Sequence, residues 1–103
     1  MSNRHVARSV VLQTLFELDS REGSNVSPDE KLVENAVEFA PDKQLFPFMK
    51  QLLDVVLAKK PQLDDIIIKA APEWPLEKIA VVDRNILRLG LAELLFADRE
   101  QVP

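Results

Sequence analysis

The chain has 103 residues, which is room for one domain, and it carries 13 basic and 17 acidic residues for a net charge of −4. A hydrophobic content of 47% supports a real core, and the absence of cysteine excludes disulfides and cysteine-bound metal sites. No stretch approaches the roughly 20 apolar residues of a membrane span, and the first residues lack the apolar run of a signal peptide. We therefore expect a cytoplasmic protein with no membrane partner.

The amino-terminal segment differs in charge from the rest of the chain. Residues 1–16 contain Arg4 and Arg8 and no acidic residue, and His5 lies between the two arginines. The negative net charge argues against a protein that binds nucleic acid with its whole surface, which leaves this basic segment as the candidate contact for a polyanion. Two solvated arginines at the start of a helix are also common, and charge alone does not separate these interpretations.

The first predicted helix covers about residues 3–19. Placing successive residues 100° apart puts five of them on the inward side: Ala7, Val10, Val11, Thr14 and Leu18. Arg8, Leu12 and Phe16 line up at steps of four on another side. This stripe indicates either a helix covered by further chain or a partner-facing surface of mixed basic and apolar character.

Three further helices are predicted before the C-terminal segment. Ser27, Pro28 and Glu30 form a capping pattern for a helix that ends before Pro41. The next predicted helix spans residues 42–60, with its regular part beginning near Phe46. Proline 61 separates it from a fourth helix over residues 62–71, where we assign the isoleucine run to helix because no second strand is visible.

The C-terminal segment, residues 76–96, is apolar nearly all round from position 82 onward, which is typical of a helix enclosed by others. We therefore predict that it is the central helix of an all-α domain of about five helices over residues 1–103. Gly90 lies inside it, at a cost of about 1 kcal/mol relative to alanine. Either another backbone crosses closely at this glycine, or the glycine is merely tolerated.

Catalytic groupings are not evident in the sequence. His5 has no acid or nucleophile near it in sequence, and the only glycines are Gly23 and Gly90, so there is no glycine-rich phosphate loop. Asp64 and Asp65 look like acids at the start of a helix, which the helix dipole explains. We predict that the protein is not an enzyme and needs neither a metal nor a cofactor.

Two segments together resemble the NusB family, the helical antitermination and rRNA-transcription factors of bacteria. The first is RHVAR at residues 4–8 followed by QTLF at 13–16, and the second, more specific one is VDRNILRLGLAELL at 82–95. Leu63, Asp64 and the Trp74–Pro75 connector match in order and spacing. The resemblance covers nearly the whole chain.

The resemblance implies an all-α RNA-binding fold and a role in transcription antitermination. Family members bind the boxA element of rRNA leader transcripts together with a small-subunit ribosomal protein. Carried over by position, Arg4, His5 and Arg8 would contact phosphates. Phe16 and Asp83 are candidates for the surface that meets the protein partner, and Leu12 belongs to the same stripe as Phe16.

Two departures from the family pattern matter. His5 and Val6 occupy places where the family usually carries arginine, so RNA affinity is expected to be lower or shifted toward protonation of the histidine. The chain also stops where the resemblance implies two more helices, as a truncated or a naturally short form. An uncovered central helix predicts self-association, since each exposed Leu or Ile left in water costs roughly 1.5–3 kcal/mol.

Two other functions remain open at this point. One is a NusB-type RNA-binding domain like that found ahead of rRNA cytosine methyltransferases, which would need a catalytic domain downstream. The other is a protein-binding helical adaptor without an RNA role, which the acidic net charge favours.

Overall fold

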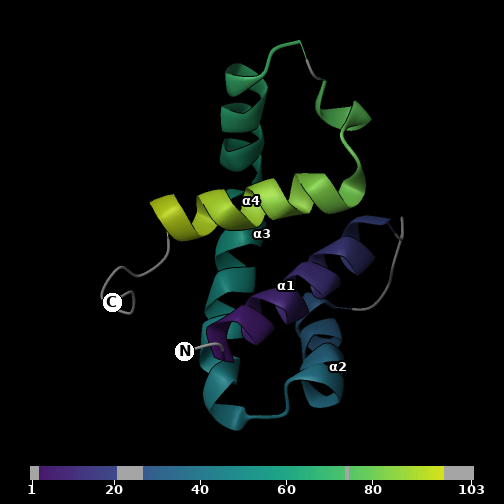
Figure 1. The fold of residues 1–103 in the computed structure, drawn as a ribbon, viewed down its shortest axis with the longest axis vertical. Helices are drawn as coiled ribbons and strands as arrows, with labels where there is room; N and C mark the ends of the chain where they lie inside the picture. Colours follow the sequence, from purple (N-terminus) through teal and green to yellow (C-terminus); the bar gives the residue numbers. More distant parts are fainter. Residues whose placement is uncertain (1–2, 21–26, 74, 97–103) are drawn as a thin grey trace.

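The computed structural model describes residues 3–20, 27–73 and 75–96, and the regular structure in these ranges is helical (Figure 1). The α-helices are α1 (Asn3–Ser20), α2 (Pro28–Phe39), α3 (Phe46–Ala70) and α4 (Val81–Leu95), and two 3-10 turns are η1 (Lys43–Leu45) and η2 (Leu76–Lys78). No strand occurs within these ranges, which confirms the all-α class. None of the described helices is long and apolar enough to cross a membrane. Trp74 of the predicted connector lies outside the described residues.

The helix starts follow from local sequence. At α2, the Ser27 hydroxyl accepts a hydrogen bond from the backbone N–H of Glu30 at 3.0 Å, and Pro28 occupies the first helical position. Helix α3 begins at Phe46 with Pro47 in its first turn, as predicted. A proline is harmless there because the N–H that it lacks would have no partner inside the helix.

The predicted break between two helices at Pro61 is wrong, because this proline lies inside α3 and the described residues form four α-helices. The two predicted helices on either side of this proline are one continuous helix. An internal proline costs about 3 kcal/mol because it removes a hydrogen bond and crowds the preceding turn. Val56 and Leu63, one turn before and shortly after Pro61, are both fully buried, so packing on either side holds the helix together across the proline.

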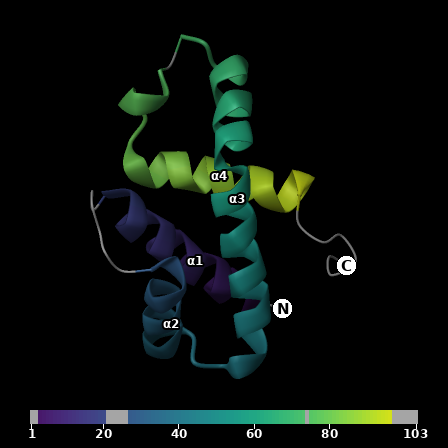
Figure 2. The same cartoon turned by 180° about the vertical axis from the view of Figure 1, so that it is seen from behind.

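The apolar core lies mainly between α1, α2 and α3, with a smaller contribution from α4. Its buried members are Ala7, Val10, Val11, Leu15, Leu32, Ala36, Ala40, Met49, Leu52, Leu53, Val56, Leu63, Leu89 and Ala92. Of the predicted inward side of α1, all but Leu18 are buried, and Leu15 is buried in addition. Helices α1 and α3 each pack against every other α-helix and are therefore the central elements (Figures 1 and 2).

The prediction that the C-terminal helix is enclosed is also wrong. Helix α4 lies across α1 and α3 and buries only the side that faces them (Figure 1). Its outer face is apolar and open to solvent: Ile86, Leu87, Leu94 and Leu95 are 49%, 44%, 63% and 44% exposed. The physical reason is that the described chain supplies neighbours for one side of α4 and none for the other.

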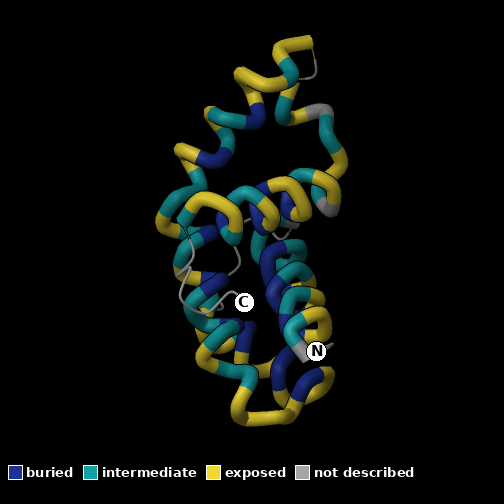
Figure 3. Tube along the Cα trace, turned by 60° about the vertical axis from the view of Figure 1, so that its left-hand side comes forward, coloured by how far each residue is buried: buried dark blue, intermediate teal, exposed yellow. Residues whose placement is uncertain are grey.

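Gly90 lies on the same outer side of α4 and is itself exposed. A Cβ atom placed on Gly90 would meet nothing within 4 Å among the described residues. One interpretation of Gly90 requires another backbone to cross closely there. No described residue makes such a crossing. Figure 3 shows the outer side of α4 and the end of α3 beyond it coloured largely as exposed or intermediate.

We predict that Gly90→Ala stabilises the fold by about 0.5–1 kcal/mol, because alanine loses less chain entropy in a helix and has free space here. Urea unfolding followed by circular dichroism measures the change. The matched control is Ala58→Gly, at an exposed position inside α3, which should lose a similar amount. A destabilised Gly90→Ala variant would contradict the open geometry at this position.

Candidate nucleic-acid interface

The two arginines of the amino-terminal segment meet on one aromatic ring. Arg4 and Arg8 are one turn apart on α1, and Phe48 comes from the first turn of α3. The guanidinium carbon of Arg4 lies 4.6 Å from the centre of the Phe48 ring, and that of Arg8 lies 5.6 Å from it. Because a ring face attracts cations, Phe48 holds two positive groups at the beginning of α1, where no acidic residue occupies the first turn.

Arg8 is also paired with α4. Its Nε donates to both carboxylate oxygens of Glu93, at 2.8 and 3.0 Å. The Arg8 side chain is 39% exposed, and its two terminal Nη groups make no hydrogen bond to the described residues. One edge of the guanidinium is therefore fixed by Glu93, and the other edge is available to an anion.

His5 lies between the arginines in sequence but on a neighbouring side of the helix. The residue is exposed, and its backbone carbonyl accepts a hydrogen bond from the Ser9 hydroxyl at 3.1 Å. Helical geometry places His5 about 100° around α1 from Arg4. The structure thus brings Arg4 and Arg8 together and leaves His5 on the neighbouring side of the same helix end.

The three residues predicted to meet a protein partner do not form one uniform patch. Leu12 is half-buried and packs against the core, on the side of α1 from which Arg8 contacts α4. At Leu12, the Arg8–Leu12–Phe16 stripe is therefore covered by further chain, which is the first of its two interpretations. Phe16 is half-buried, and Asp83 is exposed in the first turn of α4, on the outer side that also carries Ile86.

A second charged cluster lies around the first half and middle of α4 and joins three helices. Arg88 is only 5% exposed, and its Nε and Nη2 donate to the two carboxylate oxygens of Asp64 on α3 at 2.7 and 3.0 Å. Its Nη1 donates to Asp19 of α1 at 3.1 Å and to the amide oxygen of Asn85 at 3.2 Å. The two-fold contact with Asp64 matches the fork geometry in which arginine binds carboxylates most strongly.

Within this cluster, the Asp19 carboxylate lies within 4 Å of three basic side chains. Lys60 Nζ lies 3.8 Å and Arg84 Nη2 lies 3.7 Å from its carboxylate, in addition to Arg88. Burial by itself raises the pKa of Asp19, but the charges of Lys60, Arg88 and Arg84 and the hydrogen bond from Arg88 outweigh it, so the pKa lies below its ordinary 3.8. Burial lowers the pKa of Arg88, but the carboxylates of Asp64 and Asp19 outweigh this effect, so its pKa is raised.

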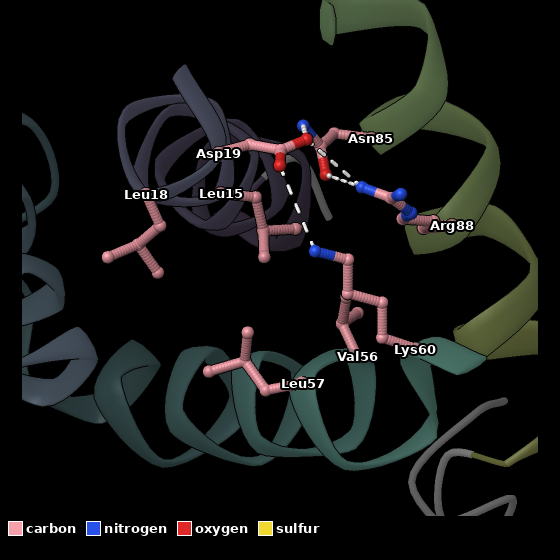
Figure 4. Close-up of a pocket in the computed structure, with 8 residues that line it drawn as sticks. All are labelled: Leu15, Leu18, Asp19, Val56, Leu57, Lys60, Asn85 and Arg88. Carbon is pink, nitrogen blue, oxygen red and sulfur yellow. Dashed lines mark hydrogen bonds and ion pairs between the residues drawn. The ribbon is translucent and has the colours of Figure 1, made fainter. Parts of the chain in front are cut away.

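The cluster borders a small cleft, in which Asp19, Lys60, Asn85 and Arg88 point toward one another above apolar side chains of α1 and α3 (Figure 4). The cleft measures about 60 Å³, which holds a few waters. Small-molecule sites typically measure about 300 Å³ or more. The described residues also contain no group of three His, Asp or Glu side chains that could hold a metal ion. We therefore interpret the cluster as a structural clamp.

The clamp and the Arg8–Glu93 pair were not predicted from the sequence. The helix-start interpretation of Asp64 is wrong, because Asp64 lies well inside α3. Arg88 was noted only as part of a family motif. The one available signal was a set of charged residues in a largely apolar helix, which indicates buried partners without identifying them.

Comparison with known proteins places this helical domain among the transcription antitermination proteins, which are not enzymes. The chain belongs to the NusB family, whose model matches residues 5–103. It is 39% identical to transcription antitermination protein NusB of Bacillus pumilus over 97% of this chain and 70% of that protein. The NusB proteins of Bacillus subtilis and Desulforudis audaxviator are 40% and 38% identical, each over 92% of this chain and 67% of theirs. No solved structure matches significantly.

We predict that Asp19→Asn destabilises the protein at neutral pH by about 2 kcal/mol, because Arg88 loses a charged acceptor. The folded-state pKa of Asp19 is lowered, so its contribution is complete above the unfolded pKa near 4 and is lost as the pH falls through the folded value. The difference in unfolding free energy between wild type and variant should therefore shrink between pH 5 and pH 2.5.

Denaturant unfolding at several pH values measures this difference. Asp65→Asn is the matched control, because Asp65 is 59% exposed and only pairs with Lys69 one turn away. Such exposed pairs contribute little. A difference between wild type and Asp19→Asn that stays constant across this pH range would contradict the assignment.

Proposed function

We propose that this chain is an RNA-binding transcription antitermination factor that contacts a boxA-like RNA through Arg4, His5 and Arg8 at the beginning of α1. The observation that carries the proposal is the arginine pair held on the Phe48 ring. Membership of the NusB family supports an RNA ligand. The acidic net charge of −4 supports a local contact of this kind over binding by the whole surface.

The pairing of Arg8 with Glu93 is compatible with this role. Glu93 uses the Nε edge of Arg8, and a phosphate would use the Nη edge, so both contacts fit one planar guanidinium. Holding the arginine in place before RNA arrives reduces the side-chain entropy lost on binding. Glu93 also adds a negative charge nearby, which limits affinity. We therefore expect a modest contribution from each arginine.

We further propose that the protein works together with a small-subunit ribosomal protein. Asp83 is exposed on α4 and Phe16 is partly exposed on α1, which supports a partner contact at these residues. Leu12 is half-buried against the core, so any contact that it makes is confined to its exposed part. The partner and the RNA would then meet different parts of the α1–α4 side of the molecule.

The RNA assignment predicts that Arg4→Gln/Arg8→Gln weakens binding of a single-stranded boxA RNA oligonucleotide by about tenfold at low salt. The slope of log affinity against log salt concentration should become shallower by about 1.4, which corresponds to two lost phosphate contacts. Fluorescence anisotropy over a salt series measures both quantities. Lys43→Gln/Lys69→Gln removes the same charge at two other exposed positions and should change little.

A second variant separates an RNA contact from a purely structural role of Arg8. Glu93→Gln removes the ion pair but keeps both arginines, so it should retain or tighten RNA binding. If Glu93→Gln weakens binding as much as the arginine variant does, Arg8 acts only by holding α1 on α4. Unchanged RNA affinity in the arginine variant, with a ribosomal protein still bound, would favour the adaptor function instead.

We also propose that the protein self-associates through the outer face of α4. This face carries Ile86, Leu87 and Leu94 near the exposed Gly90, with Asp83 at the start of the helix and Leu95 at its end, and a largely apolar strip of this kind is typical of an interaction surface. A second copy can supply the apolar cover that the described chain does not.

We expect sedimentation velocity to show a dimer that grows with protein concentration, and we expect Ile86→Glu/Leu94→Glu to be monomeric. Burying a carboxylate at the contact would be strongly unfavourable. Ile68→Glu is the matched control, since Ile68 is 47% exposed on α3 away from this face. A wild-type protein that stays monomeric at millimolar concentration would contradict the proposal.

A further inference from the structure

Helix α2 carries apolar side chains that the fold leaves exposed. Val33, Val37 and Phe39 are 46%, 69% and 57% exposed. Helix α2 packs on α1 and α3 with its inner side only, at the end of the molecule away from α4 (Figures 1 and 2). Its outer side is therefore a surface distinct from the arginine pair and from the outer face of α4.

Two grooves lie beside α2. The α1–α2 groove measures about 230 Å³ and is lined by Val6, Ser9, Val10, Gln13 and Phe39. The α2–α3 groove measures about 330 Å³, and its lining includes Val33, Val37, Ala40 and Phe46. Both are large enough to accept an apolar side chain from a partner.

A ridge of acidic residues runs along α2 between the two grooves. Glu30, Glu34 and Glu38 recur at steps of four, which places them in one row on the helix. Glu34 pairs with Lys31 at 3.2 Å, whereas Glu30 and Glu38 make no ion pair within the described part of the chain. Five acidic and two basic residues, the latter being Lys31 and Lys43, lie between positions 28 and 43, so the surface is negative.

We propose that the outer side of α2 is a docking surface for a basic, amphipathic polypeptide segment. Its apolar side chains would enter the two grooves, and its lysines or arginines would lie along the Glu30–Glu34–Glu38 ridge. A helix-in-groove contact uses apolar residues spaced three and four apart in this way. Charge complementarity identifies the partner's chemistry, because apolar grooves alone would not.

The same charges exclude the other occupants. An RNA would bring phosphates against the acidic ridge. In a two-fold dimer each copy presents the same patch, so the ridge would face itself. Like charges placed opposite one another across an interface are unfavourable. A basic polypeptide is the one partner for which both the grooves and the ridge are favourable.

The test uses a fluorescein-labelled helical peptide of about 16 residues, long enough to cover the 12 residues of α2. One side of the peptide is leucine and the other is lysine, and a second peptide carries glutamate in place of lysine. Fluorescence anisotropy with the whole protein should show binding of the lysine peptide and none of the glutamate peptide. Equal binding of the two peptides would overturn the proposal.

Substitutions locate the site. Val37→Ser/Phe39→Ser should weaken binding about tenfold, as expected when central apolar anchors are lost. Ile68→Ser, at an apolar position on α3 that is 47% exposed, should leave binding unchanged. Glu30→Gln/Glu38→Gln should weaken binding and reduce its salt dependence. The control Asp65→Asn/Glu77→Gln removes the same amount of charge elsewhere and should leave both quantities unchanged.

Thermal unfolding checks that each variant folds. If Val37→Ser/Phe39→Ser does not fold, Glu30→Gln/Glu38→Gln still tests the proposal. Equal weakening by the site and control variants would mean unspecific attraction to an acidic protein and would overturn the proposal. So would loss of self-association in Val37→Ser/Phe39→Ser with peptide binding unchanged, since that result assigns the surface to a second copy.

Discussion

The position of α4 depends on one buried arginine. Arg88 is held by Asp64 of α3 and Asp19 of α1, so a single side chain joins the three helices that meet there. A buried pair of this kind adds little stability over apolar packing, but removing one member leaves an uncompensated charge. Its main effect is therefore on geometry: α4 can cross α1 and α3 only where the guanidinium reaches both carboxylates.

The arrangement of α4 decides the chemistry of the surfaces around it. Nearer the carboxyl end of α4 than the clamp, Glu93 reaches Arg8 and holds it beside Arg4 on the Phe48 ring. The residues proposed to contact RNA are thus positioned by α4 and by the first turn of α3. The clamp also directs Ile86 and Leu94 outward, and this creates the apolar strip proposed for self-association.

Three of the proposed surfaces, those for RNA, a second copy and a basic polypeptide, differ in chemistry and centre on different helices. The beginning of α1 is basic, the outer side of α4 is apolar, and the outer side of α2 combines apolar grooves with an acidic ridge. Their separation allows an RNA, a second copy and a basic polypeptide to be bound without direct competition. An acidic net charge is consistent with this division, because only one helix end needs to attract a polyanion.

The sequence by itself determined the features that depend on neighbouring residues: the helical class, the Ser27 cap, the start of α3 at Phe46 and the inward side of α1. It also carried the family motifs. Only the tertiary structure decided that α3 continues through Pro61, that α4 is open on one side, and that Arg8 and Arg88 are paired. The arginine pairs join residues 24 to 85 positions apart, and helical periodicity and capping patterns carry no information about which charged groups meet. The other two features depend on which helices pack against α3 and α4.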